Sequence, residues 1–348
     1  MLTHLQQSED LPSTAKSAST TSPTFTIAPL SQDHAAAIFF NWSNSEHWNP
    51  TAQGDDLGEV YFPLDSGAFF AGMTISPTTG ETKIVSILSG VRHGAEQAWV
   101  GFYIVDPAQR GHGYGLKTFQ HVLNKHLGND SARTSIGLDG VMAQVGNYRK
   151  SGFTNVAWQN ERRHGDLVQL VEVQEAVLAD KIRSGGVSGL RDLATVDGAQ
   201  LAAMEVQYSG LKRPEFVRRW VQFHSGVQET KHRFGTAVLA EDGKVLGFGC
   251  IRPAQTSYRI GPIYASSPEV AKQILVKMAI DVVETDKRHP LGVPLEIDID
   301  VPNTNKHAVE LFDGLGWKDT FPSLRMWKGP VPEHDVNGVF GIATLEVG

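Results

Sequence analysis

The chain has 348 residues, and its 31 Lys and Arg against 38 Asp and Glu give a formal net charge of −7 at pH 7. Hydrophobic residues make up 41% and charged residues 20%, which indicates a globular protein of about two domains at roughly 150 residues each. The acidic balance excludes a general nucleic-acid binder, the lack of a long apolar run excludes a membrane-spanning helix, and a single cysteine excludes a disulfide framework.

The first segment, residues 1–24, is rich in Ser, Thr and Pro and has no continuous apolar stretch. A secretory signal would need such a stretch after a basic start. A transit peptide has little support, because Lys16 is the only lysine or arginine there. We therefore predict a disordered tail over 1–24 and, from the single cysteine, a cytoplasmic protein.

The following part of the chain alternates strand and helix patterns. Apolar and β-branched runs predict strands at 68–73, 83–88, 99–105 and 135–139, the first two joined by a turn at 77–80. The spacing of apolar residues predicts a helix over 116–127, and a short helix over 146–151 ends at Gly152.

The second half repeats this order of elements. Strands are predicted at 234–239, 245–251, 258–264 and 295–301, and helices at 268–284 and 305–315. A Gly/Ser-rich stretch at 184–189 separates the halves. The repeat indicates an internal duplication. We predict an α/β (α+β) protein with a domain at 25–172, a linker at 173–189 and a second domain at 190–348.

A glycine-rich turn lies between the predicted strand at 99–105 and the predicted helix at 116–127, and it reads Arg110-Gly111-His112-Gly113-Tyr114-Gly115. Alternating glycines let successive backbone N–H groups face one concavity at a helix N-terminus, which favours an anion such as a pyrophosphate. A Walker A loop would need GK[ST], and a dinucleotide fingerprint would need a glycine where Leu116 stands. Both are therefore disfavoured.

This turn resembles the acetyl-CoA loop of the GCN5-related N-acetyltransferases, whose pattern is [RQ]xxGx[GA]. The segment from Tyr148 to Phe153 is similar to the YxxxGF motif of the same superfamily. Further segments resemble a subfamily with two such domains in tandem, among them Trp48-Asn49-Pro50, Tyr258-Arg259-Ile260-Gly261-Pro262 and Arg325-Met326-Trp327-Lys328-Gly329-Pro330. The resemblance implies two domains, each with a mixed, mostly antiparallel sheet flanked by helices.

The resemblance also implies a binding site for acetyl-CoA as the acyl donor. In the superfamily, a backbone N–H of the strand before the loop polarises the thioester carbonyl. Carried over to this chain, the donor site comprises Tyr103, Ile104, Val105, Arg110, Gly111, His112, Gly113, Tyr114, Gly115 and Asn147. The proton donor of the superfamily falls on Tyr148, whose alternative role is that of a core aromatic residue.

The general base is not fixed by the sequence. Many relatives carry a glutamate within the strand that corresponds to 99–105, and no acidic residue occurs there. Glu96 lies just before the strand, and Asp139 lies on the next one, where it could equally be a turn residue. Glu46 and Trp48 occupy an early loop that shapes the acceptor pocket in the superfamily, and their alternative is an ordinary surface loop.

The second half departs from the motif, since its turn at 263–269 has no RxxGxG and its YxxxGF counterpart at 312–317 begins with Phe312. We therefore expect a degenerate second domain. Arg252 and Arg259 are candidates for binding the acceptor, for example through a carboxylate, and a structural salt bridge to Asp298 or Asp300 is the alternative.

Taken together, the sequence predicts an N-acetyltransferase that acts on a small amine or amino-acid-like acceptor. An O-acyltransferase of a metabolite hydroxyl and a non-catalytic acyl-CoA sensor are the alternatives. No metal site is predicted, because HExxH is absent and His121 and His126 do not share a helix face. No nucleic-acid or membrane partner is expected, and the oligomeric state is left open.

Overall fold

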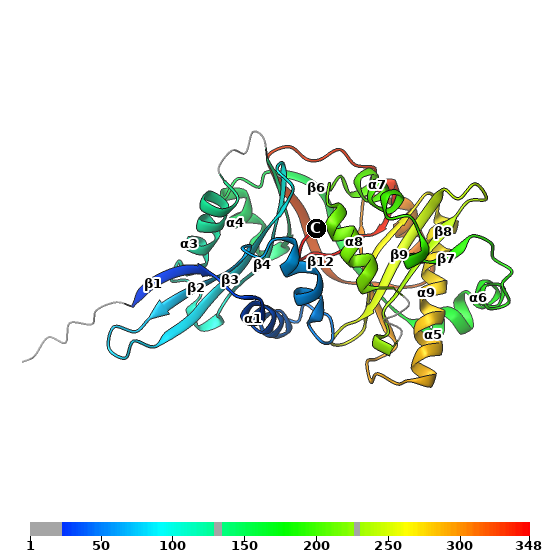
Figure 1. Ribbon diagram of the computed structural model, residues 1–348, viewed down its shortest axis with the longest axis horizontal. Helices are drawn as coiled ribbons and strands as arrows, with labels where there is room; N and C mark the ends of the chain where they lie inside the picture. The colour runs from blue at the N-terminus through cyan, green and yellow to red at the C-terminus, as the bar shows by residue number, and fades with distance from the viewer. Residues whose placement is uncertain (1–22, 129–133, 226–229) are drawn as a thin grey trace, which may run out of the picture.

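The computed structural model describes residues 23–128, 134–225 and 230–348 (Figure 1). The predicted tail lies, as far as residue 22, outside the described residues, and the first strand begins at Thr24. Within the described ranges, no helix combines the length and apolar character that a bilayer crossing requires.

The first half places helices on a mostly antiparallel set of strands. Its strands are β1 (Thr24–Pro29), β2 (Phe69–Ile75), β3 (Thr82–His93), β4 (Gln97–Val105), β5 (Ser135–Val141) and β6 (Asn155–Asp166). Its helices are α1 (Gln32–Ser45), α2 (Phe62–Leu64), α3 (Tyr114–His121), α4 (Val145–Lys150) and α5 (Leu167–Gln169), with short turns η1 (Leu57–Tyr61), η2 (Pro107–Gln109), η3 (Val122–His126), η4 (Met142–Gln144) and η5 (Leu170–Gln174). The four strands and two helices predicted here are confirmed, whereas β1, α1 and β6 were not predicted.

The second half repeats the scheme after helix α6 (Ala176–Arg183). Its strands are β7 (Leu190–Asp192), β8 (Phe234–Leu239), β9 (Val245–Pro253), β10 (Tyr258–Ala265), β11 (Glu296–Pro302), β12 (Lys318–Lys328) and β13 (Val339–Gly341). Its helices are α7 (Gly198–Ser209), α8 (Pro214–Phe223), α9 (Pro268–Arg288) and α10 (Lys306–Gly314), with turns η6 (Leu193–Thr195) and η8 (Val336–Gly338). The predicted strands and helices are confirmed, and α9 is longer than predicted.

The two halves exchange strands at the middle of one sheet. Its order is β1-β2-β3-β4-β5-β12-β6-β11-β10-β9-β8-β7, with β13 beside β10. Strand β12 of the second half thus lies between β5 and β6 of the first, and β6 pairs with β11. We propose a division into domains at 25–172 and 190–348, with β12 inserted among the strands of the first domain and β6 beside β11 of the second. Helix α6 lies in the segment between the two domains.

In each half, two neighbouring parallel strands pair over three residues and then separate, which leaves an opening between them. In only one half does another strand enter this opening. Strand β4 pairs in parallel with β5 only from Gln97 to Trp99, and β10 pairs in parallel with β11 only from Tyr258 to Ile260. Beyond Ile260, the short strand β13 pairs with β10 at Ile263 and Tyr264. The opening of the second half is therefore filled by the chain itself, while the opening between β4 and β5 borders a cavity.

The C-terminal segment lies at the centre of the molecule, between the halves (Figure 1). Two glycines allow this close approach: a Cβ on Gly101 of β4 would lie 2.0 Å from the Glu346 carbonyl oxygen, and one on Gly261 of β10 would lie 2.1 Å from that of Ala343. A buried apolar cluster joins the halves as well, since Tyr61 stacks on Trp220 of α8 at 6.0 Å. The two halves therefore form one packed unit around this segment.

Candidate active site

The glycine turn leads directly into α3, as its sequence predicts. Gly111 and Gly113 have φ values of +85° and +79°, which only glycine adopts without strain, and the space beside both is open. Gly113 is the N-cap of α3, and no side chain caps the helix. The N–H groups of the first helical turn thus remain available to an anion, which the helix dipole also favours.

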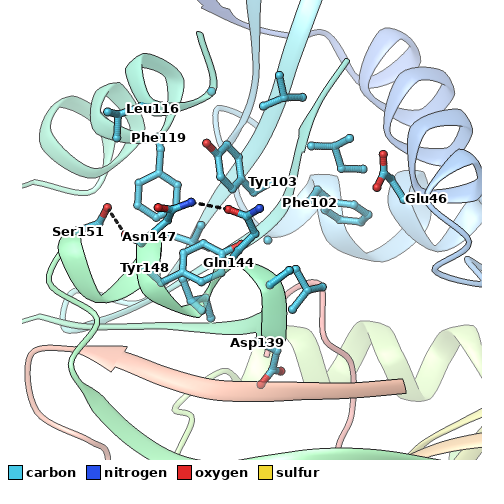
Figure 2. A pocket seen from close by; sticks show the side chains of 18 of the residues that line it. Glu46, Phe102, Tyr103, Leu116, Phe119, Asp139, Gln144, Asn147, Tyr148 and Ser151 are labelled. Carbon is cyan, nitrogen blue, oxygen red and sulfur yellow. Dashed lines mark hydrogen bonds between the residues drawn. The ribbon is translucent and has the colours of Figure 1, made fainter. Parts of the chain in front are cut away.

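A cavity of about 1180 Å³ extends from this turn into the opening between β4 and β5 (Figure 2). The predicted residues that line it are Glu46, Trp48, Tyr103, Ile104, Val105, Arg110, Gly111, Gly113, Tyr114, Gly115, Asp139, Asn147 and Tyr148. The structure therefore brings most of the predicted site together, from both sides of the opening.

Strand β4 bends at the mouth of the opening. Phe102 has φ +52°, and the pairing of β4 with β3 shifts register between Ile87 and Ser89. Such a bulge turns the strand away from its neighbour and leaves backbone groups without ladder partners. The β4 backbone that follows Phe102 thus lines the cavity wall.

Tyr148 projects from α4 into an aromatic cluster at the cavity (Figure 2). Its ring lies 6.4 Å from that of Tyr103 and 6.0 Å from that of Phe119. Gly140 permits this position, since a Cβ there would approach the Tyr148 ring to 2.8 Å. Burial raises the pKa of Tyr148 well above its usual range, so the phenol keeps its proton at neutral pH.

Asp139 lines the cavity, but its side chain is fully buried in an ion pair. Arg325 of β12 donates from Nε to Oδ1 at 3.0 Å and from Nη2 to Oδ2 at 2.6 Å, and Asn160 Nδ2 donates to Oδ1 at 2.9 Å. The Arg325 guanidinium lies over the rings of Trp99 and Trp158. Burial raises the pKa of Asp139 although Arg325 opposes it. With both oxygens occupied, Asp139 serves as an anchor between β5 and β12.

Four other predicted residues do not line this cavity. Glu96 is exposed and pairs with Lys212 at 3.4 Å, because it precedes β4 at the end remote from the opening. His112 stacks on Tyr114 at 6.0 Å in a neighbouring hollow. Arg252 is buried over the Trp220 ring and donates to Thr51 Oγ1 at 3.0 Å.

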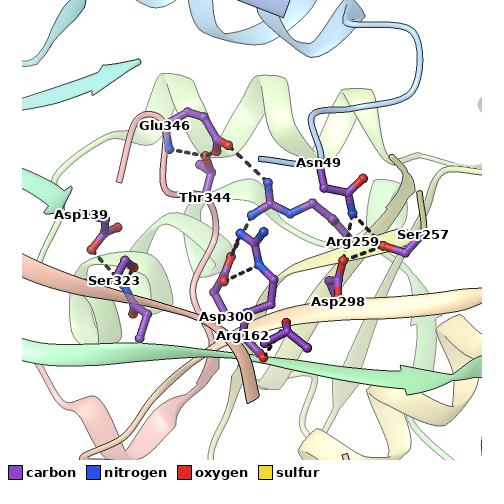
Figure 3. A network of polar contacts seen from close by, with 12 residues as sticks. Asn49, Asp139, Arg162, Ser257, Arg259, Asp298, Asp300, Ser323, Thr344 and Glu346 are labelled. Atoms are coloured by element: carbon purple, nitrogen blue, oxygen red, sulfur yellow. Dashed lines mark hydrogen bonds and ion pairs between the residues drawn. The ribbon is translucent and has the colours of Figure 1, made fainter. Parts of the chain in front are cut away.

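Arg259 forms the structural ion pair that the sequence left as the alternative to acceptor binding. Its Nη2 donates to Asp300 at 2.7 Å, and its Nη1 donates to Glu346 at 3.2 Å. Arg162 binds the same Asp300 carboxylate in bidentate fashion, at 2.9 and 3.1 Å. The arginine thus points into a buried network that reaches the cavity only through its partners (Figure 3).

Sequence reasoning missed the cavity residues that the second half supplies: Phe321, Ser323, Lys328, Leu345 and Glu346. They come from β12 and from the C-terminal segment. Lys328 belongs to the 325–330 segment that resembles the tandem subfamily, but no site role was inferred for it, and no motif marks the others. Only the strand exchange brings them to the first half. Arg162 of β6 was missed for the same reason.

The C-terminal segment is held in place by backbone contacts beside the cavity. Trp99 Nε1 donates to the Leu345 carbonyl at 3.0 Å, and Arg213 Nη1 donates to that of Val347 at 3.0 Å. His93 Nε2 also donates to the Val347 carbonyl, at 2.8 Å. Three buried side chains, two of them from the first half, therefore fix Leu345 and Glu346 at the cavity wall.

Protonation of His93 should weaken this arrangement. Burial, and then the Arg213 charge, lower the pKa of His93 to about 3. Below about pH 6.5, His93 binds a proton in the unfolded chain but not in the folded chain. The free energy of unfolding therefore falls by about 1.4 kcal/mol per pH unit as the pH decreases towards 3. Between pH 6.5 and 5 this amounts to about 2 kcal/mol. Glutamine does not titrate, so in urea unfolding the free energy of unfolding of His93→Gln should fall by about 2 kcal/mol less than that of the wild type between pH 6.5 and 5. Equal falls in both proteins would contradict a buried, neutral His93.

Comparison with known proteins agrees with this geometry. A model of the acetyltransferase (GNAT) domain matches residues 201–341, which lie in the half without the glycine turn. The chain is 26% identical over 325 residues to the holothin acyltransferase of Pseudoalteromonas sp. (strain SANK 73390), covering 93% of this chain and 95% of that protein.

Two solved structures share the fold over almost their whole length. A proposed acetyltransferase from Pyrococcus horikoshii has a TM-score of 0.65 at 19% identity, with 99% of this chain and 100% of that one covered. A tandem GNAT protein from the clavulanic acid biosynthesis pathway has a TM-score of 0.56 at 16% identity, with 88% and 99% covered. The predicted fold class, tandem GNAT-like units in a mixed and mostly antiparallel sheet, is confirmed.

By fold and family match, the protein is an acyltransferase. Residues 201–341 match the acetyltransferase (GNAT) domain family, and the chain has the tandem form of the GNAT fold.

Proposed function

We propose that the cavity between β4 and β5 transfers an acetyl group from acetyl-CoA to the amino group of a small molecule. The observation that carries the proposal is the continuity of this cavity, which runs from the uncapped N-terminus of α3 along β4 to Tyr148. A donor with an anionic pyrophosphate at one end and a thioester at the other would fit this cavity, with the pyrophosphate at the N-terminus of α3 and the thioester beside β4 and Tyr148.

Contrast with the second half supports a single donor site. At its equivalent turn, the Ser267 hydroxyl accepts from Val270 N at 3.3 Å, and Pro268 has no N–H to offer. Glu269 adds a negative charge in the first turn of α9, and β13 fills the opening beside β10. An anionic donor would meet no free helix terminus and no gap there, so we assign acyl-CoA binding to the first half.

An amine acceptor is supported by Glu346, a carboxylate of the cavity lining that can accept a hydrogen bond from an amine N–H. The other two carboxylates of the lining, Glu46 and Asp139, are paired with Arg110 and Arg325. The holothin acyltransferase to which the chain is similar supports a small-molecule acceptor as well. Acetyl-CoA is the simplest donor that this reaction class uses, and the family implies an acyl-CoA.

The proposed reaction forms one C–N bond and breaks one C–S bond. The lone pair of the acceptor nitrogen attacks the thioester carbonyl carbon, and backbone N–H groups of β4 stabilise the resulting oxyanion. When the carbonyl re-forms, the electron pair of the C–S bond stays on sulfur, and Tyr148 gives its proton to that thiolate. The attacking nitrogen releases one proton to a base, and the products are an amide and free CoA.

Tyr148→Phe should separate turnover from binding. The change removes one hydroxyl and little volume, so folding and the Kd for CoA should persist. Loss of a general acid costs roughly a hundredfold in kcat. We expect this fall in thiol release from acetyl-CoA, measured where chemistry limits the rate.

Tyr208→Phe is the matched control, because Tyr208 of α7 is equally buried and packs on Tyr264, remote from the cavity lining. It should leave kcat unchanged. Equal rates for wild type and Tyr148→Phe would reduce Tyr148 to a packing residue and remove it from the mechanism.

A further inference from the structure

The base that the proposed reaction needs is not among the residues expected to supply it. Glu96 is exposed outside the cavity, and both oxygens of Asp139 are engaged by Arg325. Of the remaining two carboxylates in the lining, Glu46 pairs at 2.5 Å with Arg110, which belongs to the glycine turn proposed to bind the donor. That leaves Glu346 of the C-terminal segment.

Resting on the proposed function above, we propose that Glu346 binds the acceptor's amino group and takes the proton that its nitrogen releases during attack. The segment comes from the second half of the chain and is laid against the first. The donor site and the base would thus come from different halves.

The position of Glu346 fits this role. Its backbone lies on Gly101, so closely that any side chain at that position would collide with it. Phe102, the next residue, is where β4 bends open beside the donor surface. The backbone of Glu346 is therefore anchored one residue from the strand segment at which the thioester is expected.

Glu346 accepts two side-chain hydrogen bonds, against three for Asp139. Oε1 accepts from Arg259 Nη1 at 3.2 Å, and Oε2 accepts from the Thr344 hydroxyl. Glu346 shares the Arg259 guanidinium with Asp300, which accepts the shorter bond from Nη2, at 2.7 Å (Figure 3). A carboxylate can accept about four hydrogen bonds, so Glu346 has capacity left for an amine.

The groups around Glu346 keep it ionised. Burial opposes ionisation, but Arg259 from β10, the Thr344 hydroxyl and Arg252 from β9 together lower the pKa of Glu346. Asp56 and Tyr61 face the same space from the first half. An ionised carboxylate can accept a hydrogen bond from the N–H of a neutral amine. Once that nitrogen has attacked it becomes strongly acidic, so even a weak base removes its proton.

Electrons and protons balance in this scheme. The nitrogen pair forms the C–N bond, and the N–H bonding pair returns to nitrogen as the proton passes to a Glu346 oxygen. Tyr148 protonates sulfur. After release of the products, solvent takes the proton from Glu346 and restores one to Tyr148. Arg259 acts here as a positioning residue, because it holds the carboxylate without touching the substrate.

The first test is Glu346→Gln, which retains the shape of the side chain and its contact with Thr344. We expect kcat/KM for the amine to fall about a hundredfold or more. The Kd for CoA and the Tm should stay near those of the wild type. Glu333→Gln is the matched control, since Glu333 is exposed on the same C-terminal stretch and does not line the cavity.

The second test uses the pH profile, which a merely structural role would not move. Arg259→Met and the milder Thr344→Val each remove a group that lowers the pKa of Glu346. The acidic limb of kcat/KM should therefore move to higher pH in both variants, and further in Arg259→Met. Thr344→Val keeps the test open where Arg259→Met fails to fold.

The outcomes separate the two proposals. Suppose the wild type acetylates amines, Glu346→Gln has the same kcat/KM, and the acidic limb of Thr344→Val does not move. That result overturns the role of Glu346 and leaves the proposed function standing. A wild-type chain that binds CoA but acetylates no amine overturns the proposed function and this inference with it. Loss of turnover in Glu346→Gln with intact CoA binding supports both.

Discussion

Replacing Gly113 with glutamate is expected to abolish CoA binding. Gly113 has φ +79° at the N-cap of α3, and a side chain there adopts a strained backbone at a cost of about 1–3 kcal/mol. The new carboxylate would also occupy the open space beside the turn and repel the pyrophosphate. Together these effects should raise the Kd, measured by calorimetry, by about a hundredfold or more.

Gly243→Glu is the matched control for backbone strain. Gly243 has φ +83° in the turn between β8 and β9, with open space around it and no place in the cavity lining. Its replacement should lower the Tm without changing the Kd for CoA. Equal losses of CoA affinity in the two variants would contradict a donor site at the first-half turn.

Breaking the Asp139–Arg325 pair should have the largest effect on stability. Arg325→Leu leaves the Asp139 carboxylate buried without its cation, which costs about 3–5 kcal/mol in the free energy of unfolding. The pair also joins β5 of the first half to β12 of the second. We therefore expect the loss in urea unfolding to be accompanied by loosening of the strand exchange, seen as faster amide exchange in β12.

Two variants make this result specific. Arg218→Leu breaks the exposed pair with Glu215 on α8 and should cost less than about 1 kcal/mol. Asp139→Leu combined with Arg325→Leu removes both buried charges and should recover much of the stability. If Asp139→Asn kept full stability but lost turnover, Asp139 would be a catalytic base and its assignment as an anchor would be wrong.

The local pattern of this sequence predicted most of the elements that carry the donor site. Strand β4, the glycine turn and α3 are adjacent in the chain, so periodicity and turn chemistry determine them together. Tyr148 belongs to a short helix ended by Gly152, whose φ of +97° is the expected signal. These residues reach the cavity through local structure and one parallel pairing between strands.

The acceptor side depends on long-range pairing that no local signal encodes. Strand β12 follows β6 by more than 150 residues and still lies between it and β5. Glu346 reaches Gly101 only because the segment after β13 crosses between the halves. Reasoning from neighbouring residues therefore offered Glu96 as one of two candidate bases, although it lies at the end of β4 remote from the opening.

Arg252 and Arg259 were expected near the acceptor because they lie on or near a strand whose counterpart in the first half was predicted to face the donor. In the structure β13 occupies that side of the second half, and both guanidinium groups point into the buried interface instead. Arg259 forms the alternative that the sequence left open, an ion pair with Asp300, and it also contacts Glu346.

The most direct test of the account is a mass-spectrometric screen of wild-type protein with acetyl-CoA and a panel of small amines, amino acids and matched alcohols. The account predicts amide products that carry one added acetyl group, formed together with free CoA and lost in Gly113→Glu. Ester products alone, or CoA binding without any product, would contradict it.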